Sequence, residues 1–335
     1  MTLYLCIIEL EYRKEMIKMI QKKKGRFKKI LLTVLGVLIC LIIFIFLSNK
    51  ILLKIEKGKI EPYGQLVSVD GKNMNVLIEG SGEQTIVILP GYGTASPVID
   101  FEPLRAEFSN DYKLVVVEPF GYGLSDFTDK ERTISNLTSE LHECLEQLGI
   151  NEYILMGHSI FGIYAMDYID NYADEVIAFV GLDSSVPNQF NQGEEPNLSI
   201  LNGVYRSGIV RPVLKLSELI SKKEDADNFD KNKVKQLNMI TNRNLGNKSV
   251  ANEGADFAHN FGAAKKLSFP KNMPVIFFLA DSSNDNFPQW QQWHEELVEN
   301  LDNSKVISYE ADHYIHHTKS KEIKIELDDF LNNAL

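Results

Sequence analysis

A serine flanked by glycines is the first feature of this sequence that could carry chemistry. Residues 157–162 read Gly-His-Ser-Ile-Phe-Gly, which places Ser159 between an apolar β-like run, residues 153–156, and a helical pattern, residues 163–172. A strand-turn-helix setting of this kind exposes a serine hydroxyl at the edge of a sheet. The helix amino terminus also favours a developing negative charge, so we expect Ser159 to act as a nucleophile.

A serine nucleophile requires a general base, and His313 is the histidine best placed to supply it. It follows a β-like run, residues 305–309, and gives the chain order serine, acid, histidine. His158 belongs to the serine turn itself, and His294 lies in a helical pattern that predicts a surface position. His313 is therefore the predicted base.

His316 and His317 follow closely, and imidazoles at spacings of three and four from His313 can share a metal ion. Neither an HExxH-type carboxylate nor a cysteine partner accompanies them. We interpret both as loop residues near the site. The sequence predicts no metal and no cofactor.

The elements that must position these side chains alternate between strands and helices. Nearly continuous apolar runs are typical of parallel strands that helices bury on both faces. Residues 134–148 and 163–172 are the predicted helices, and this rhythm predicts an α/β fold with a doubly wound, mostly parallel sheet. The predicted strands are residues 65–69 and 74–78, joined by an Asp-Gly turn as an antiparallel entry, and residues 85–89, 113–118, 153–156, 176–182, 275–279 and 305–309.

Four local features together resemble the α/β-hydrolase superfamily, from about residue 65 to the carboxyl terminus. They are the loop Ile-Leu-Pro-Gly-Tyr-Gly that ends at residue 93, the turn that begins with Glu-Pro-Phe-Gly at residue 118, the serine elbow and the segment around His313. The resemblance implies that Ser159 is the nucleophile and His313 the base. It also implies that the backbone N–H groups of Tyr92 and Ile160 form the oxyanion hole.

The acidic member of such a triad is open between three aspartates. The superfamily usually places the acid a few residues beyond the penultimate strand, where this chain has Ser283, with Asp281 slightly early and Asp285 slightly late. Asp183 ends the strand after the elbow helix, a site that some similar lipases use. Any strand end within reach of His313 would serve, and we favour Asp183.

Phe161 departs from the superfamily pattern, which has a small residue two positions after the nucleophile. The tight turn brings that position against a neighbouring strand, so a phenyl ring must find room there. We expect a tilted elbow or an unusual neighbour.

Residues 187 to about 270 interrupt the alternation with a polar, asparagine-rich region that is too long for a loop. We interpret it as a helical cap over one end of the sheet, with an amphipathic piece at residues 209–220. Phe287, Trp290 and Trp293 lie near the penultimate strand, and we interpret them as a helix that packs its aromatic side chains against the sheet rather than as a ligand platform.

The amino-terminal segment predicts a membrane anchor. Residues 1–29 are rich in lysine and arginine, residues 30–47 contain no charge, and residues 48–62 form a lysine-rich linker before the domain at 63–335. Eighteen apolar residues just span a bilayer, and neither a cleavage site nor a polar stripe interrupts them. Basic residues are denser before the run, so we expect a single-pass protein of the cell membrane with a cytoplasmic amino terminus and an extracellular domain. We also expect translation to start at Met16 or Met19.

Charge restricts the partners of the domain. Residues 1–60 hold 13 of the 35 Lys+Arg and 4 of the 46 Asp+Glu, so the remainder holds 22 against 42, a formal charge of −20. A field of this sign repels phosphate backbones, and we expect no nucleic-acid partner. The predicted function is hydrolysis of a small-molecule ester or amide through an acyl-enzyme on Ser159, without a cofactor. The alternatives are a peptidase and a membrane-tethered binding or sensor module without turnover.

Overall fold

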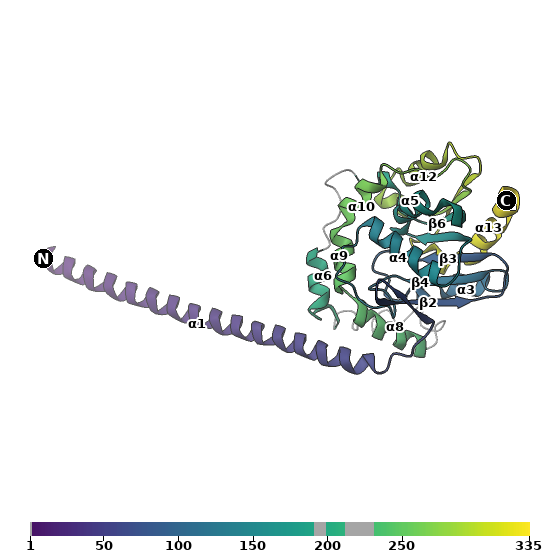
Figure 1. The fold of residues 1–335 in the computed structure, drawn as a ribbon. Helices are drawn as coiled ribbons and strands as arrows, with labels where there is room; N and C mark the ends of the chain where they lie inside the picture. Colours follow the sequence, from purple (N-terminus) through teal and green to yellow (C-terminus); the bar gives the residue numbers. More distant parts are fainter. Residues whose placement is uncertain (1, 191–198, 212–230) are drawn as a thin grey trace.

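The fold is built on one mostly parallel sheet. The computed structural model describes residues 2–190, 199–211 and 231–335, and in these ranges eight strands follow the order β1-β2-β4-β3-β5-β6-β7-β8 (Figure 1). β2 pairs antiparallel with β1 and β4, and all other neighbours are parallel, which confirms the predicted class. The strands are β1 Gln65–Val69, β2 Lys72–Glu79, β3 Thr85–Leu89, β4 Lys113–Glu118, β5 Tyr153–His158, β6 Val176–Leu182, β7 Val275–Ala280 and β8 Ser304–Tyr309.

Helices cover both faces of this sheet, as a doubly wound topology requires. Along β3, Val87 and Leu89 pack into the core on one face, and Ile86 and Ile88 pack into the core on the other. The period of two between the faces is that of any strand. The first face is covered by α4 Ile134–Gln147, α5 Phe161–Tyr172 and α12 Trp290–Val298, and the second by α2 Pro97–Asp100, α3 Glu102–Phe108 and α13 Ser320–Ala334.

The region between β6 and β7 is helical where the structure describes it. Its helices lie together beside the carboxyl ends of the central strands, and the predicted amphipathic piece at 209–220 falls largely outside the described residues (Figure 1). We call this region the cap. Its helices are α6 Ser199–Arg206, α8 Lys231–Asn244, α9 Lys248–Ala255 and α10 Phe257–Ala264, and the short α11 Ser283–Asn286 follows β7.

A single long helix, α1 Thr2–Lys57, precedes the sheet and extends away from it on the side of α6 and α8 (Figure 1). It includes the apolar run 30–47 and continues through most of the residues expected to form a linker. Within the described residues, it is the one helix long and apolar enough to cross a membrane. The limits of a spanning segment and its orientation stay predictions.

The turn after β4 is organised by a buried carboxylate. Glu118, the last residue of β4, is fully buried and accepts hydrogen bonds from Tyr63 Oη at 2.9 Å, Asn75 Nδ2 at 2.9 Å and the Leu124 N–H at 2.7 Å. Burial raises the pKa of this carboxyl group, while these hydrogen bonds act to lower it. A Cβ at Gly123 would lie 1.7 Å from Glu118 Oε2, so only glycine fits there.

We expect Glu118→Ala to lower the free energy of unfolding by about 3 kcal/mol, because several buried donors lose their acceptor at once. Urea denaturation of the variant measures this loss. Glu131→Ala, which removes an exposed carboxylate, is the matched control and should change the value by less than about 0.5 kcal/mol. Equal losses in the two variants would contradict the role given to Glu118.

Candidate active site

Ser159 lies in a sharp turn between β5 and α5. Its φ is 53°, in the left-handed region that non-glycine residues rarely adopt. Three backbone hydrogen bonds hold this conformation: the Ser159 N–H donates to Leu182 O at 3.2 Å, and Ser159 O accepts from Gly162 at 3.0 Å and from Ser185 at 2.7 Å. The loop after β3 passes so close that a Cβ at Gly91 would lie 2.8 Å from the Ser159 Cβ. A strained conformation that the surroundings impose in this way is typical of functional sites.

The structure brings Ser159, His313 and Asp183 into one hydrogen-bonded line. His313 Nε2 lies 3.0 Å from Ser159 Oγ, and His313 Nδ1 lies 2.6 Å from Asp183 Oδ2. The side chain of His313 is 42% exposed, whereas that of Asp183 is fully buried. A carboxylate in this position fixes the tautomer of the imidazole and leaves Nε2 free to accept a proton from the serine.

The buried carboxylate of Asp183 is held by three further donors. Oδ1 accepts from the Ala280 N–H at 2.9 Å and from Trp290 Nε1 at 2.7 Å, and Oδ2 accepts from Ser283 Oγ at 2.5 Å. Ser283 stands at the position where the superfamily usually has its acid. Here its hydroxyl instead donates a hydrogen bond to the carboxylate of Asp183. Trp290 packs against the sheet, as expected, but also supports this carboxylate, a role that the sequence did not indicate.

The other two candidate acids lie elsewhere. Asp281 Oδ1 accepts the Ala311 N–H at 3.0 Å, which orders the start of the His313 loop, and Asp285 lies in α11. Among the hydrogen bonds of the described residues, neither aspartate bonds to His313. The geometry therefore favours Asp183.

Ile160 directly follows Ser159 in the turn, and Tyr92 follows Gly91, whose backbone lies against Ser159. Within the described ranges, the backbone N–H of neither Ile160 nor Tyr92 donates to another protein group. The Tyr92 side chain is anchored in the cap, because Tyr92 Oη donates to Val250 O at 2.9 Å and accepts from Asn202 Nδ2 at 3.0 Å. Burial raises the pKa of this phenol to about 12. Two free N–H groups beside a nucleophile suit a developing oxyanion.

A second tie links this loop to the cap. The Gly93 N–H donates to Tyr122 Oη at 3.2 Å, and Tyr122 Oη donates to Glu253 Oε2 at 2.7 Å. Tyr164, on the elbow helix, donates to Glu253 Oε1 at 3.1 Å. Glu253 belongs to α9 and is buried, and burial raises its pKa. The cap thus contributes directly to the order of the loop and of the elbow helix.

Phe161 finds its room at Gly157. A Cβ at Gly157 would lie 2.3 Å from Phe161 Cδ1, so the phenyl ring occupies the space where another residue would have a side chain. Gly162 supplies the small residue of the tight turn, since a Cβ there would lie 2.2 Å from Ser185 O. The ring also lines a cavity of about 30 Å³ together with Leu89. The unusual neighbour expected from the sequence is therefore a glycine four residues earlier.

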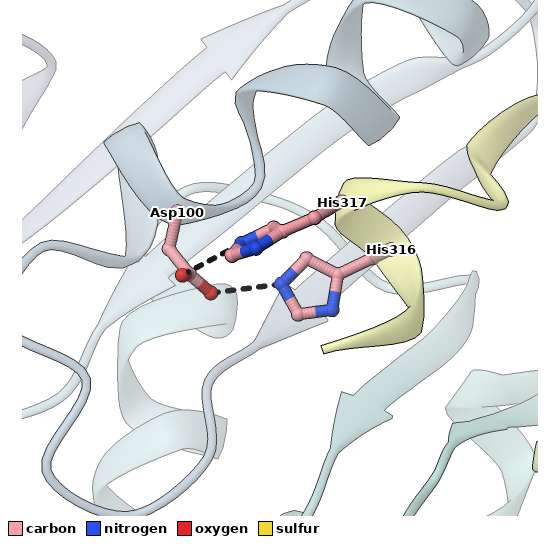
Figure 2. Close-up of side chains that lie close together, drawn as sticks. All are labelled: Asp100, His316 and His317. Atoms are coloured by element: carbon pink, nitrogen blue, oxygen red, sulfur yellow. Dashed lines mark hydrogen bonds and ion pairs between the residues drawn. The ribbon is translucent and has the colours of Figure 1, made fainter. Parts of the chain in front are cut away.

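His316 and His317 lie in a short 3₁₀ turn, Ile315–His317, directly after His313. Figure 2 shows both rings directed at Asp100, the last residue of α2. His316 Nε2 lies 2.9 Å from Asp100 Oδ2, and His317 Nε2 lies 3.0 Å from Oδ1. Burial acts to raise the pKa of Asp100, but the hydrogen bonds from the two rings outweigh it and lower the pKa. This clamp holds the His313 loop to α2.

The donor types in this clamp are also those of a metal site, with all three atoms within 4.8 Å of one another. Each carboxylate oxygen already accepts one ring N–H, which accounts for the arrangement without an ion. The expectation of no metal stays a prediction.

His158 lies between the clamp and the base. Its Nε2 lies 3.1 Å from His313 O, and its ring centroid is 4.7 Å from that of His313 and 4.8 Å from that of His316. Burial and the neighbouring imidazoles lower its pKa well below 6.5, so the ring is neutral and donates from Nε2 to the carbonyl. Burial also lowers the pKa of His316.

One expectation was wrong. His294 is not a surface residue but is fully buried in α12, with Nδ1 2.7 Å from Trp290 O and Nε2 2.8 Å from Ser184 O. The face of α12 that carries His294 is turned toward the sheet. The side chain therefore reaches Ser184 and ties α12 to the loop after β6.

The lowered pKa of His158 predicts a dependence of stability on pH. Around and below pH 6.5 the unfolded chain binds more protons at this histidine than the folded one, so the free energy of unfolding should fall as the pH is lowered from 6.5 to 5. Urea denaturation across this range should show a weaker dependence for His158→Gln. His259→Gln, a change at an exposed histidine of α10, should retain the full dependence. An identical pH dependence in all three proteins would contradict the assignment.

Known proteins share parts of this sequence and most of this fold. No family model matches the chain. An uncharacterized protein of Bacillus subtilis, YbdG, is 35% identical over 164 residues, which is 48% of this chain and 50% of that protein. A karrikin insensitive 2 receptor of Petunia hybrida is 36% identical over 90 residues, 26% of this chain and 33% of the receptor. The matches thus span at most half of these relatives.

Solved structures match over most of the chain. An epoxide hydrolase from Vigna radiata superimposes with a TM-score of 0.60 at 16% identity, over 81% of this chain and 98% of the other. An enol-lactonase from Burkholderia xenovorans gives a TM-score of 0.53 at 16% identity, over 80% and 100%. Together with the strand order and the serine elbow, these similarities show that the chain has the α/β-hydrolase fold.

Proposed function

We propose that this protein is a serine hydrolase that cleaves a carboxylic ester through an acyl-enzyme on Ser159. The observation that carries the proposal is the line from Ser159 Oγ through His313 to the buried Asp183, with 3.0 Å and 2.6 Å between successive polar atoms. Neither a buried carboxylate nor a strained serine is needed for packing. Each instead meets a requirement of nucleophilic catalysis.

The geometry supports a two-step mechanism. His313 Nε2 accepts the Ser159 proton as Oγ attacks the substrate carbonyl, and the N–H groups of Tyr92 and Ile160 stabilise the oxyanion. The ester C–O bond then breaks, and the leaving alcohol takes its proton from His313. A water molecule, activated by the same histidine, releases the acid from Ser159. Asp183 stabilises the imidazolium that forms in each step.

The proposed substrate is a small ester, and an amide or peptide is the nearest rival. The enol-lactonase among the structural neighbours is named for an ester substrate, which agrees with this choice. Epoxide hydrolases share the fold, but relatives with that activity begin from an aspartate, whereas this turn holds a serine. No cofactor is required.

We further propose that α1 anchors the protein in the cell membrane by one span at residues 30–47. The basic residues before this run favour an amino terminus in the cytoplasm and a hydrolase domain outside.

We expect the detergent-purified full chain to be labelled covalently by a fluorophosphonate probe at Ser159. Ser159→Ala should abolish labelling, and His313→Ala should lower its rate by at least about 10²-fold, because Oγ then lacks its base. Gel fluorescence and peptide mass spectrometry measure both. Ser207→Ala, which removes a half-buried hydroxyl of the cap, is the control and should label normally. An unlabelled wild type would refute the proposal.

We expect Asp183→Asn to lower ester turnover by about 10²-fold or more, because an amide no longer fixes the His313 tautomer. Asp281→Asn, a change in a carboxylate that orders the same loop without contacting the imidazole, should cost less than about tenfold. Adding Ser283→Asp to Asp183→Asn should restore part of the loss, since Ser283 Oγ lies 2.5 Å from the present carboxylate. Similar small losses in Asp183→Asn and Asp281→Asn would mean that the acid is misassigned.

A second candidate is a membrane-tethered receptor that keeps the fold and binds its ligand without turnover. Two observations favour it: the similarity to a protein named as a receptor, and Phe161 in place of a small residue beside the nucleophile. Probe labelling without measurable turnover of any of a panel of short-chain esters would support this candidate. Turnover above about one per minute would exclude it in favour of the enzyme.

A further inference from the structure

The cap is fastened to α1 close to the end of the apolar run. Arg211, just after α6, donates from Nη1 to Asn49 Oδ1 at 2.9 Å and forms an ion pair with Glu56. Gly208 lies against the same asparagine: a Cβ there would lie 2.6 Å from the Asn49 Cβ, and its φ of 79° also requires glycine. Asn49, Leu53 and Glu56 form a half-buried face on a helix that is otherwise largely exposed. α8 also packs against α1.

With residues 30–47 as the proposed span, this contact lies at the depth of lipid headgroups. The apolar run ends at Leu47, and at about 1.5 Å of rise per residue Asn49 is only about 3 Å beyond it. The polar layer on each side of a bilayer is about 5–8 Å thick, so the Asn49 contact falls inside that layer. Lys50, Lys54 and Lys57 are exposed on the remaining surface of α1, where anionic headgroups attract lysine by about 1 kcal/mol each.

Helix α6 connects this depth to the reaction centre. Asn202, on α6, donates to Tyr92 Oη at 3.0 Å, and the Tyr92 N–H is one of the proposed oxyanion donors. Gly208 lies six positions after Asn202, so the last turn of α6 and the short turn that follows Arg206 join the oxyanion loop to the contact with α1. Val204 and Ile209, in the same segment, are each 41% exposed. Apolar side chains at this depth can contact acyl chains.

We propose that the substrate is a membrane lipid ester that reaches Ser159 from the bilayer, past α6. This inference rests on the proposed hydrolase function and on the proposed anchor. Ser159 Oγ takes the acyl group, and the lipid ester C–O bond breaks. The alcohol of the headgroup portion leaves with the proton from His313, and water then releases the fatty acid. A substrate that never leaves the membrane must be admitted at headgroup depth, and the fastening of α6 to α1 holds α6 at that depth.

The full chain, reconstituted into vesicles of phosphatidylcholine and phosphatidylglycerol, tests this inference. One fluorogenic ester is long-chain and embedded in the bilayer, either in the same vesicles as the protein or in separate ones. The other is a water-soluble short-chain butyrate. We expect the embedded ester to be hydrolysed at least tenfold faster when it shares a vesicle with the protein than when it is in separate vesicles. Arg211→Ala should lower that rate about fivefold or more and change the butyrate rate less than twofold.

The control variants separate docking from folding. Glu56→Arg combined with Arg211→Glu reverses the ion pair and should restore most of the rate on the embedded ester. Lys233→Ala, which removes a cap ion pair with Glu102 and leaves the contact of Arg211 with α1 intact, should leave both rates unchanged. The lipid inference would be overturned if the protein hydrolysed butyrate but hydrolysed the embedded ester no faster in shared vesicles than in separate ones. It would also be overturned if Arg211→Ala left the rate on the embedded ester unaltered. Either result would leave the proposed hydrolase function intact. Failure on both esters, together with absent probe labelling, would overturn the proposed function itself.

Discussion

The buried carboxylate of Asp183 is the constraint on which the site depends. A charge enclosed in the interior is tolerated only when hydrogen bonds replace its lost hydration. Here the donors come from the end of β7, from α11, from α12 and from the His313 loop. Each of these segments lies more than 90 residues further along the chain than the carboxylate itself. The strands β7 and β8 and the segments that follow each of them must therefore be in place for His313 to lie beside Ser159.

Local pattern was enough to predict the strands and to select Ser159 and His313, which the structure brings together in the candidate site. Parallel strands buried on both faces leave uninterrupted apolar runs, and the serine turn and His313 each follow such a run. The acid was harder, because any of several strand ends could present a carboxylate, and only the fold shows that Ser283 donates to Asp183. Asp100 gave no signal at all, since 216 residues separate it from His316. The prediction that His294 lies on the surface was wrong for a similar reason, because helical periodicity alone did not show that this face of the helix is turned toward the sheet.

The cap is more than a cover over the reaction centre. Tyr92 and Gly93 are both tied to it, the first through Val250 and Asn202 and the second through Tyr122 and Glu253. The loop after β3 therefore depends for its order on a region whose helices also contact α1. Two short chains of hydrogen bonds thus join the cap to Tyr92 and Gly93.

The packing of Phe161 over Gly157 limits the order in which these two positions could change during evolution. With the phenyl ring in place, any side chain at position 157 collides with it, so the glycine is fixed for as long as the phenylalanine remains. If position 161 first changes to a smaller residue, position 157 can then accept a side chain. If position 157 changes first, the chain passes through a variant in which its side chain collides with Phe161. A chain with a small residue at position 161 would therefore need glycine at position 157 before phenylalanine could replace that residue.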